Sequence, residues 1–156
     1  MFPFRRVSGF TSGGFFLYIM KRRKLKGGVR NWEKRIDPPF HRFIRLRDTN
    51  RDGYGSCVTC NKDIHFSEEA QAGHFMPRQN KNTRWDERNV NIQCYRCNMF
   101  EGGAQYAYSK FLGEDLAEEL VIASKQIRKF SEQEFEDLYY YYKELVETLE
   151  KKKRFL

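Results

Sequence analysis

Long hydrophobic runs are missing from this 156-residue sequence, and no apolar stretch approaches the roughly 18 residues needed to cross a bilayer. The stretch from Phe15 to Met20 is short for the core of a signal peptide. It lacks a small-residue cleavage site, and several basic residues follow it directly. We therefore expect an intracellular protein with no membrane partner.

Cysteine and histidine are scarce as well. The chain has four Cys and three His, and the cysteines occur only as two close pairs. A disulfide does not easily close a loop of two residues, so such pairs favour reduced thiols that bind a metal. With 40% hydrophobic and 32% charged residues, the chain has enough apolar material for a modest core. Its length fits one domain, or one domain with an extension.

Acidic residues are almost absent from the N-terminal part. Residues 1–37 carry ten Lys/Arg and two Asp/Glu, so they account for the whole formal charge of +8. Residues 38–112 carry +3 and residues 113–156 carry −3. A basic arm on a nearly neutral body fits a polyanionic partner, most simply nucleic acid. A tail that only improves solubility would have the same composition.

The basic arm, residues 1–36, contains glycine pairs and shows no helical or strand period, so we predict an irregular and flexible segment. Met20 followed by three basic residues would make a natural protein start. We therefore hypothesise that residues 1–19 are an over-extended reading frame.

Residues 37–112 form the predicted core, which begins with a helix. Asp37 followed by Pro38 is typical of a helix start, with Asp as the N-cap and Pro in the first helical position. This helix is expected to end near Asp48, because the turn-forming sequence Asn50-Arg51-Asp52-Gly53 follows.

Short strands and a second helix are predicted in the rest of this core. We expect a β-hairpin around the first cysteine pair, a strand over residues 72–76 and another over residues 90–93. A helix is expected to begin at Asn98, where Gly102-Gly103 would interrupt or bend it.

The C-terminal region, residues 113–156, is predicted to be helical. Ser131 and Glu134 have the spacing of a capping box, and Phe130 and Phe135 that of a hydrophobic staple. The apolar positions 135, 138, 142, 145 and 149 then recur at helical spacing. This stripe is expected to pack on the body, or to form the seam of a homodimer.

The two Cys-x-x-Cys pairs are the clearest chemical signal. Cys57 and Cys60, with Cys94 and Cys97, provide the four thiolates of a tetrahedral zinc site. Because four protein ligands leave no open position, this Zn²⁺ is predicted to be structural. Any catalysis must therefore come from other residues.

The polar insert between the two pairs resembles a known family. The order His74, Asn89 and then Asn98 directly after the last cysteine is similar to that of the HNH, or His-Me finger, nucleases. Three motifs narrow the resemblance to the NinG/Rap family of phage recombination endonucleases, over about residues 38–150. They are Cys57-x-x-Cys60, Ala72-Gly73-His74-Phe75 and the block from Arg84-Trp85-Asp86-Glu87-Arg88-Asn89 to Cys94-x-x-Cys97-Asn98.

This resemblance implies an α+β fold, in which a small zinc-stapled ββα-metal (HNH-like) finger is flanked by an N-terminal helix and C-terminal helices. It also implies metal-dependent cleavage of DNA, especially branched or Holliday-junction recombination intermediates, by a phage or prophage protein in the bacterial cytoplasm. His74 would be the general base, Asn98 a ligand of a catalytic Mg²⁺ or Mn²⁺, and Asn89 would orient the loop or His74.

The sequence departs from this pattern at its acidic positions. Many HNH enzymes carry an acid directly before the histidine, where this chain has Gly73. The family can place Asp three residues before the histidine, where this chain has Gln71. A hard cation normally requires a carboxylate ligand, for which we consider Glu87 first. The other candidates are Glu101, Asp86, Glu68 and Glu69.

Basic residues around the insert are the predicted contacts with DNA phosphates, namely Arg78, Lys81, Arg84 and Arg88. The alternative is a non-catalytic zinc-finger module that binds nucleic acid or a recombination partner. In that case His74 and Asn98 would only form hydrogen bonds near the zinc, and the basic residues would belong to a solvated loop.

Overall fold

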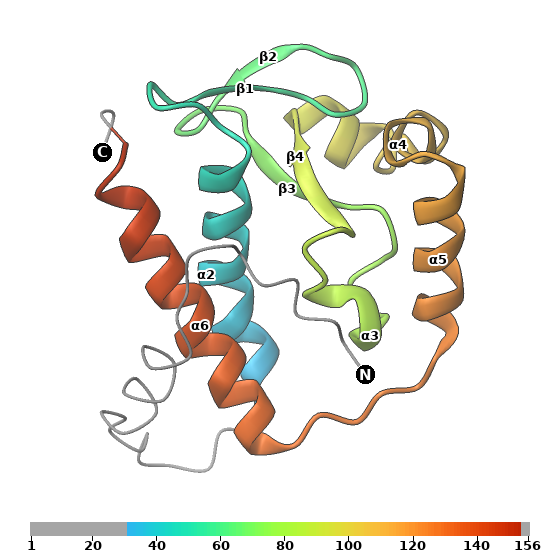
Figure 1. Ribbon diagram of the computed structural model, residues 1–156. Helices are drawn as coiled ribbons and strands as arrows, with labels where there is room; N and C mark the ends of the chain where they lie inside the picture. Colours follow the sequence, from blue (N-terminus) through green and yellow to red (C-terminus); the bar gives the residue numbers. More distant parts are fainter. Residues whose placement is uncertain (1–30, 154–156) are drawn as a thin grey trace. The chain divides into compact units, whose positions relative to one another are not determined.

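The computed structural model describes residues 31–153, which belong to one compact unit (Figure 1). The proposed over-extended reading frame, residues 1–19, and most of the basic arm lie outside the described residues. The described part is a mixed α+β domain with two short antiparallel strand pairs, which confirms the predicted class (Figure 1). None of its helices is long and apolar enough to cross a membrane.

Helix α2 runs from Trp32 to Arg47 and begins six residues earlier than predicted. Residues 32–36, which the sequence analysis placed in the arm, form its first turns, and Pro38 lies inside the helix. The local signal of a proline was overridden by burial, because Trp32 and Ile36 belong to the core. Asp37 is consequently not an N-cap.

Helix α6, Glu132–Glu150, packs along α2 (Figure 1). The ring of Tyr142 lies 4.8 Å from that of Phe40, and Phe135 stacks on Trp32 at 6.3 Å. The capping box at Ser131 is present, as predicted. The apolar stripe of α6 therefore covers α2, and the seam on which a homodimer was hypothesised is occupied within the chain.

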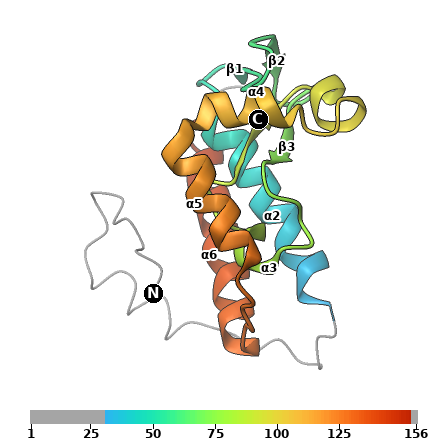
Figure 2. The same cartoon turned by 90° about the vertical axis from the view of Figure 1, so that its right-hand side faces the viewer.

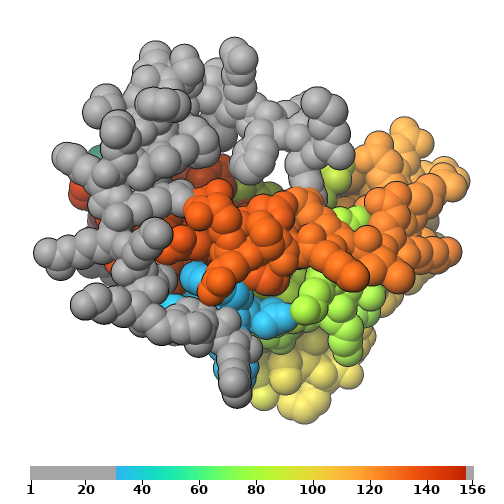
Figure 3. Space-filling model, turned by 90° about the horizontal axis from the view of Figure 1, so that it is seen from below, coloured from blue at the N-terminus to red at the C-terminus, as the bar shows by residue number. Residues whose placement is uncertain are grey.

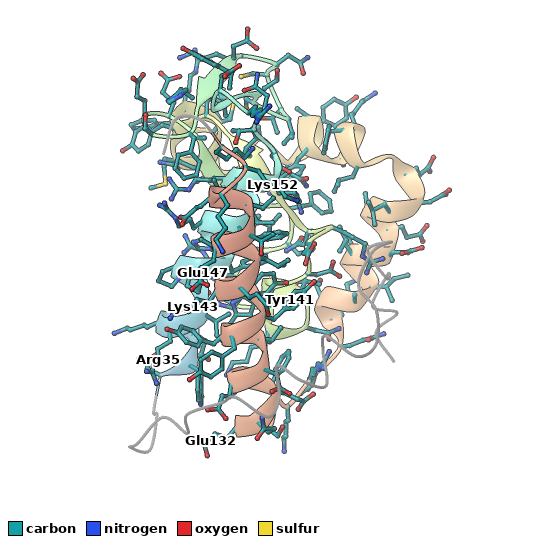
Figure 4. The ribbon with its side chains drawn as sticks, turned by 60° about the vertical axis from the view of Figure 1, so that its left-hand side comes forward. Arg35, Glu132, Tyr141, Lys143, Glu147 and Lys152 are labelled. Atoms are coloured by element: carbon teal, nitrogen blue, oxygen red, sulfur yellow. The ribbon has the colours of Figure 1, made fainter. Side chains whose placement is uncertain are left out.

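The outer face of α6 is polar. Lys143 and Glu147 are exposed, and they project from the helix on the side away from the core (Figure 4). At the lower end of the molecule, the first turn of α6 and the segment before it lie against α2 and α3 (Figure 3). Phe130 and Phe135 form the predicted staple there, with ring centroids 5.2 Å apart. Both rings also contact Trp85 edge-on.

Four short strands form two separate antiparallel pairs. Strand β1, Tyr54–Ser56, pairs with β2, Asp63–His65, and the first cysteine knuckle lies in their connection. Strand β3, Gln71–His74, pairs with β4, Val90–Gln93. The connection from β3 to β4 contains helix α3, Lys81–Arg84, in a segment that was predicted to be a polar loop.

A wide helical turn, Arg96–Phe100, begins within the second knuckle and contains Cys97, so Asn98 lies within this turn and does not begin it. Gly102 and Gly103 have positive φ angles, which end the turn as predicted. Helix α4, Gln105–Leu112, meets α5, Glu114–Lys125, at an angle next to Gly113 (Figure 2). Their buried side chains form a second core with Phe75; these are Tyr108, Ala117 and Leu120.

Candidate metal centre and adjoining cavity

The four cysteines converge although 33 residues separate the two pairs. Their sulfur atoms all lie within 4.8 Å of one another, and Cys60 Sγ lies 3.8 Å from Cys94 Sγ. Zn–S bonds of about 2.3 Å in a tetrahedron place neighbouring sulfurs about 3.8 Å apart. The residues therefore fit a zinc ion, which would cross-link the two knuckles without taking part in a reaction.

Hydrogen bonds to β4 hold the knuckles in register. Val58 N donates to Ile92 O at 3.1 Å, which attaches the first knuckle to the strand that leads into the second. The buried side chain of Gln93 donates to Thr59 Oγ1 at 3.2 Å and to Gly103 O at 2.8 Å. One side chain thus links the first knuckle to the glycine turn that follows the second.

A cavity of about 200 Å³ adjoins this centre and brings together two of the predicted catalytic residues. His74 at the end of β3 and Asn98 on the helical turn both line it, together with Arg78. Small residues complete much of the wall, namely Ala72, Pro77, Gly102 and Gly103, with Gln105 at one side. The zinc knuckle therefore places Asn98 against the same space as His74.

His74 is held in one tautomer by a backbone carbonyl. Its Nε2 lies 3.1 Å from Arg84 O, and because a carbonyl only accepts, Nε2 carries the proton. Nδ1 therefore keeps its lone pair. Burial, together with the charges of His41 and Arg78, lowers the pKa of His74 to about 3. The imidazole is neutral at pH 7 and can accept a proton.

Asn98 is oriented by β3. Its Nδ2 donates to Gln71 Oε1 at 2.6 Å, so Oδ1 remains as the amide oxygen able to bind a cation. The partner of Asn98 is therefore the amide of Gln71 and not a carboxylate.

Asn89 is fully buried beneath the loop that leads out of β3. Its Oδ1 accepts from Met76 N at 2.6 Å, and its Nδ2 donates to Met76 O and Thr83 O. Both amide hydrogens are used in these bonds, and complete burial keeps the remaining lone pair of Oδ1 away from a substrate. Of the two roles suggested by the resemblance, this geometry corresponds to orienting the loop.

The structure does not bring a carboxylate to this cavity from the residues that it describes. Glu87, the first candidate for a metal ligand, does not line the cavity; its Oε1 accepts from Tyr142 Oη at 3.3 Å, on the side that faces α6. Asp86 pairs with Arg88 at 2.8 Å, and Glu101 pairs with Arg96 at 2.8 Å. By itself the cavity therefore does not fit a hard cation such as Mg²⁺, which prefers anionic oxygens.

The packing around Gly73 leaves no room for an acidic side chain directly before His74. An added Cβ would lie 1.9 Å from Gln93 Oε1 and 2.7 Å from Gln93 Cδ. The side chain of Gln93 thus occupies the space that an acidic side chain at residue 73 would need.

Three of the four predicted DNA-binding cations are paired within the chain. Arg84 forms a two-pronged salt bridge with Asp37, with bonds of 3.0 and 2.6 Å. Lys81 pairs with Glu33 at 2.9 Å, and Arg88 bridges Asp86 and Glu119. Among residues 31–153, Arg78 has no ion pair and is exposed at the cavity.

Asp37, which was wrongly predicted to cap the helix, accepts both hydrogen bonds of the Arg84 salt bridge. It also accepts from Trp85 Nε1 at 3.0 Å. Although burial opposes it, hydrogen bonding and charge from Arg84 keep the pKa of Asp37 below its ordinary value. The Asp37–Arg84 pair thereby fixes α2 to the residue whose carbonyl orients His74.

His41 is a site residue that the sequence analysis missed. Its ring lies edge-on to His74, with centroids 5.5 Å apart, and its Nε2 is buried without a hydrogen-bond partner among the described residues. Burial is the main reason that the pKa of His41 falls to about 4. The available signal was its place one helical turn after Asp37, which puts both on one face of α2.

Arg47 and Asp48 join α2 to β4. Arg47 donates to the carbonyls of Glu87 and Val90 at 2.9 Å each and pairs with Asp48. Asp48 Oδ2 accepts from Ile92 N at 3.0 Å. The contacts of these two residues are structural.

These features define a small α+β protein in which a cluster of four cysteines that fits a zinc ion lies between two strand pairs, beside a polar cavity. The chain matches the family model described as Bacteriophage Lambda NinG protein over residues 18–153, and it belongs to that family. Neither a curated protein nor a solved structure matches the chain at a significant level.

Proposed function

We propose that this protein is an HNH-type DNA endonuclease whose catalytic residues line the cavity beside the zinc site. The observation that carries the proposal is the convergence of His74 and Asn98, which are far apart in sequence, on one cavity with Arg78. The β3–β4 pair followed by the helical turn has the ββα order of such a finger. The resemblance to phage recombination endonucleases, noted from the sequence, suggests branched recombination intermediates as the substrates.

In this proposal His74 Nδ1 is the general base. It takes a proton from a water molecule as the water oxygen bonds to phosphorus. The bond from phosphorus to the 3′ oxygen breaks, and the leaving oxygen takes a proton from solvent. The products carry a 5′ phosphate and a 3′ hydroxyl. Arg78 would pair with the non-bridging oxygens, and the phosphate's negative charge would raise the pKa of His74 from its low value in the free protein.

Among the described residues the cavity offers the amide oxygen of Asn98 and no carboxylate, so a catalytic Mg²⁺ or Mn²⁺ would depend on the DNA phosphate for anionic ligands. When bound, such an ion would supply charge neutralisation to the phosphate. Asn98 Oδ1 would be the ligand from this chain, and Gln71 would orient it through its bond to Asn98 Nδ2.

The absence of a carboxylate from the cavity lining also favours a second candidate, a zinc-stabilised module that binds DNA without cutting it. The two candidates differ in a nicking assay with a labelled four-way junction, Mg²⁺ or Mn²⁺, and a His74→Ala variant with normal zinc content. Cleavage by the wild type that is lost in the variant supports the nuclease. Junction binding with no cleavage by either protein, under both metals, supports the module.

A further inference from the structure

Large apolar side chains are exposed mainly in one segment of the described chain. Five of the eight fall within residues 95–111; they are Tyr95, Met99, Phe100, Tyr106 and Phe111. Solvent-exposed aromatic rings in such number are unusual for a surface that contacts only water. Four of the five are aromatic, so the segment offers flat rings as well as apolar area.

Two of these rings adjoin the cavity in the chain. Phe100 precedes the cavity-lining Gly102 by two residues, and Tyr106 directly follows the cavity-lining Gln105. Both side chains are 75% exposed. The ring of Tyr95 contacts the ring of Phe100 edge-on, with centroids 5.4 Å apart, and so supports the Phe100 ring. We call Tyr95, Phe100 and Tyr106 the aromatic rim.

Cations accompany the rim. Lys110 Nζ lies 5.0 Å from the centre of the Tyr106 ring, and Arg96 is highly exposed next to Tyr95, where it pairs with Glu101. Arg78 projects at the cavity itself without an ion pair among the described residues. Exposed rings that alternate with cations are the pattern by which proteins bind single-stranded nucleic acid, with bases on rings and phosphates on cations.

We propose that the aromatic rim binds unpaired bases of the DNA strand whose phosphate enters the cavity. In a continuous duplex the bases are stacked on one another and are not available to Phe100 or Tyr106. At a branch, gap or strand end, unpaired bases are available to these rings. The substrate class is therefore DNA with unpaired nucleotides beside the cleaved bond. This inference rests on the proposed DNA partner, and it adds what selects the site on that DNA.

The test measures binding by the full chain, with His74→Ala introduced so that no strand is cut. Fluorescence anisotropy compares a gapped duplex with a fully paired duplex of the same length. The rim is altered by Phe100→Leu together with Tyr106→Leu, which keeps apolar bulk and removes both rings. Tyr54→Leu is the matched control, because Tyr54 is 57% exposed on β1, away from the rim segment. Zinc content and circular dichroism confirm folding of each variant.

The rim variant should lose about tenfold or more in affinity for the gapped DNA and less than about twofold for the duplex, since each stacked base contributes about 1–3 kcal/mol. The control should match the parent on both. A 2-aminopurine base in the gap should be quenched by the parent and not by the rim variant. Unchanged affinity for both DNAs, as expected if the rim binds a protein partner, would overturn the proposal, and so would an equal loss on both.

This test is independent of cleavage. If the wild type cuts no DNA and the rim still discriminates gapped DNA from duplex DNA, the inference holds and the nuclease proposal fails. If the wild type cuts and the rim variant binds both DNAs like its parent, the nuclease proposal holds and the inference fails.

Discussion

The side chain of Gln93 fills the space beside Gly73, where a Cβ would lie 1.9 Å from Gln93 Oε1. Gly73→Ala should therefore destabilise the protein by about 1–3 kcal/mol, because a fully buried side chain that bonds to Thr59 and Gly103 must move. Urea unfolding measures the change. In a protein that already carries Gln93→Ala, Gly73→Ala should cost less stability than it does in the wild type. Equal costs in the two backgrounds would contradict the steric explanation.

Zinc is expected to be part of the folded state. Metal analysis should find one zinc ion per chain, and Cys94→Ser should abolish it and unfold the domain, because binding energy at such sites is folding energy. A chelator should shift thermal unfolding to lower temperature in the wild type. Cys94 is buried, and a folded, zinc-free Cys94→Ser protein would show that the cluster is not a metal site.

Arg78 should dominate the electrostatic contacts of the cavity with DNA. Arg78→Ala should weaken binding and reduce the slope of log affinity against log salt by about one, since one phosphate contact is lost. Arg88→Ala is the matched control, because Arg88 is already paired with Asp86 and Glu119. Equal effects of the two substitutions would contradict this distinction.

Binding of Mn²⁺ should depend on DNA, because no described carboxylate lines the cavity. Electron paramagnetic resonance of the zinc-loaded His74→Ala protein should show little bound Mn²⁺ alone and one additional bound ion with uncut DNA. Gln71→Glu places a carboxylate on Asn98 Nδ2 and should tighten Mn²⁺ binding without DNA. Stoichiometric binding by the original chain in the absence of DNA would contradict the prediction.

The pH dependence of stability should contain a contribution from His41. Its pKa is about 4 in the folded protein, against an ordinary value of 6.5 for a solvated histidine, so the unfolded chain binds more protons between these values. This contribution to stability is present above pH 6.5 and is lost as the pH falls towards 4, by at most about 1.4 kcal/mol per pH unit.

His41→Phe removes this proton site and the unpaired buried Nε2, so its unfolding free energy should fall less between pH 6.5 and 4 than that of the wild type. His65→Phe is the control, because the His65 ring contacts Tyr54 and lies outside the His41–His74 pair. An unaltered slope in His41→Phe would show that the burial of His41 is not responsible.

Local sequence signals predicted the elements whose causes are local. The Ser131 capping box and the strand over residues 90–93 depend on neighbours in the chain, and both were confirmed. The start of α2 was mispredicted because its cause is distant: Trp32 is buried against Phe135, about a hundred residues away. No local pattern contains that contact.

The sequence indicated which residues belong to the candidate site, but less well which residues they contact. His74 and Asn98 were selected by their order, and the cavity brings them together. The pairing of Arg84 with Asp37 and the contact of Glu87 with Tyr142 depend on how α2 and α6 pack, so the charge of these residues alone could not indicate their partners. His41 belongs to no motif, and only the packing of α2 against β3 brings it to His74.

The proposed nuclease depends above all on the neutral His74 imidazole, which accepts the proton of the attacking water. Chemical rescue tests this role most directly: His74→Gly, with normal zinc content, is incubated with a four-way junction and increasing imidazole. We predict that nicking is lost in the variant and returns with the concentration of neutral imidazole, which fits the vacated space. Cleavage by His74→Gly at the wild-type rate without imidazole would contradict this role.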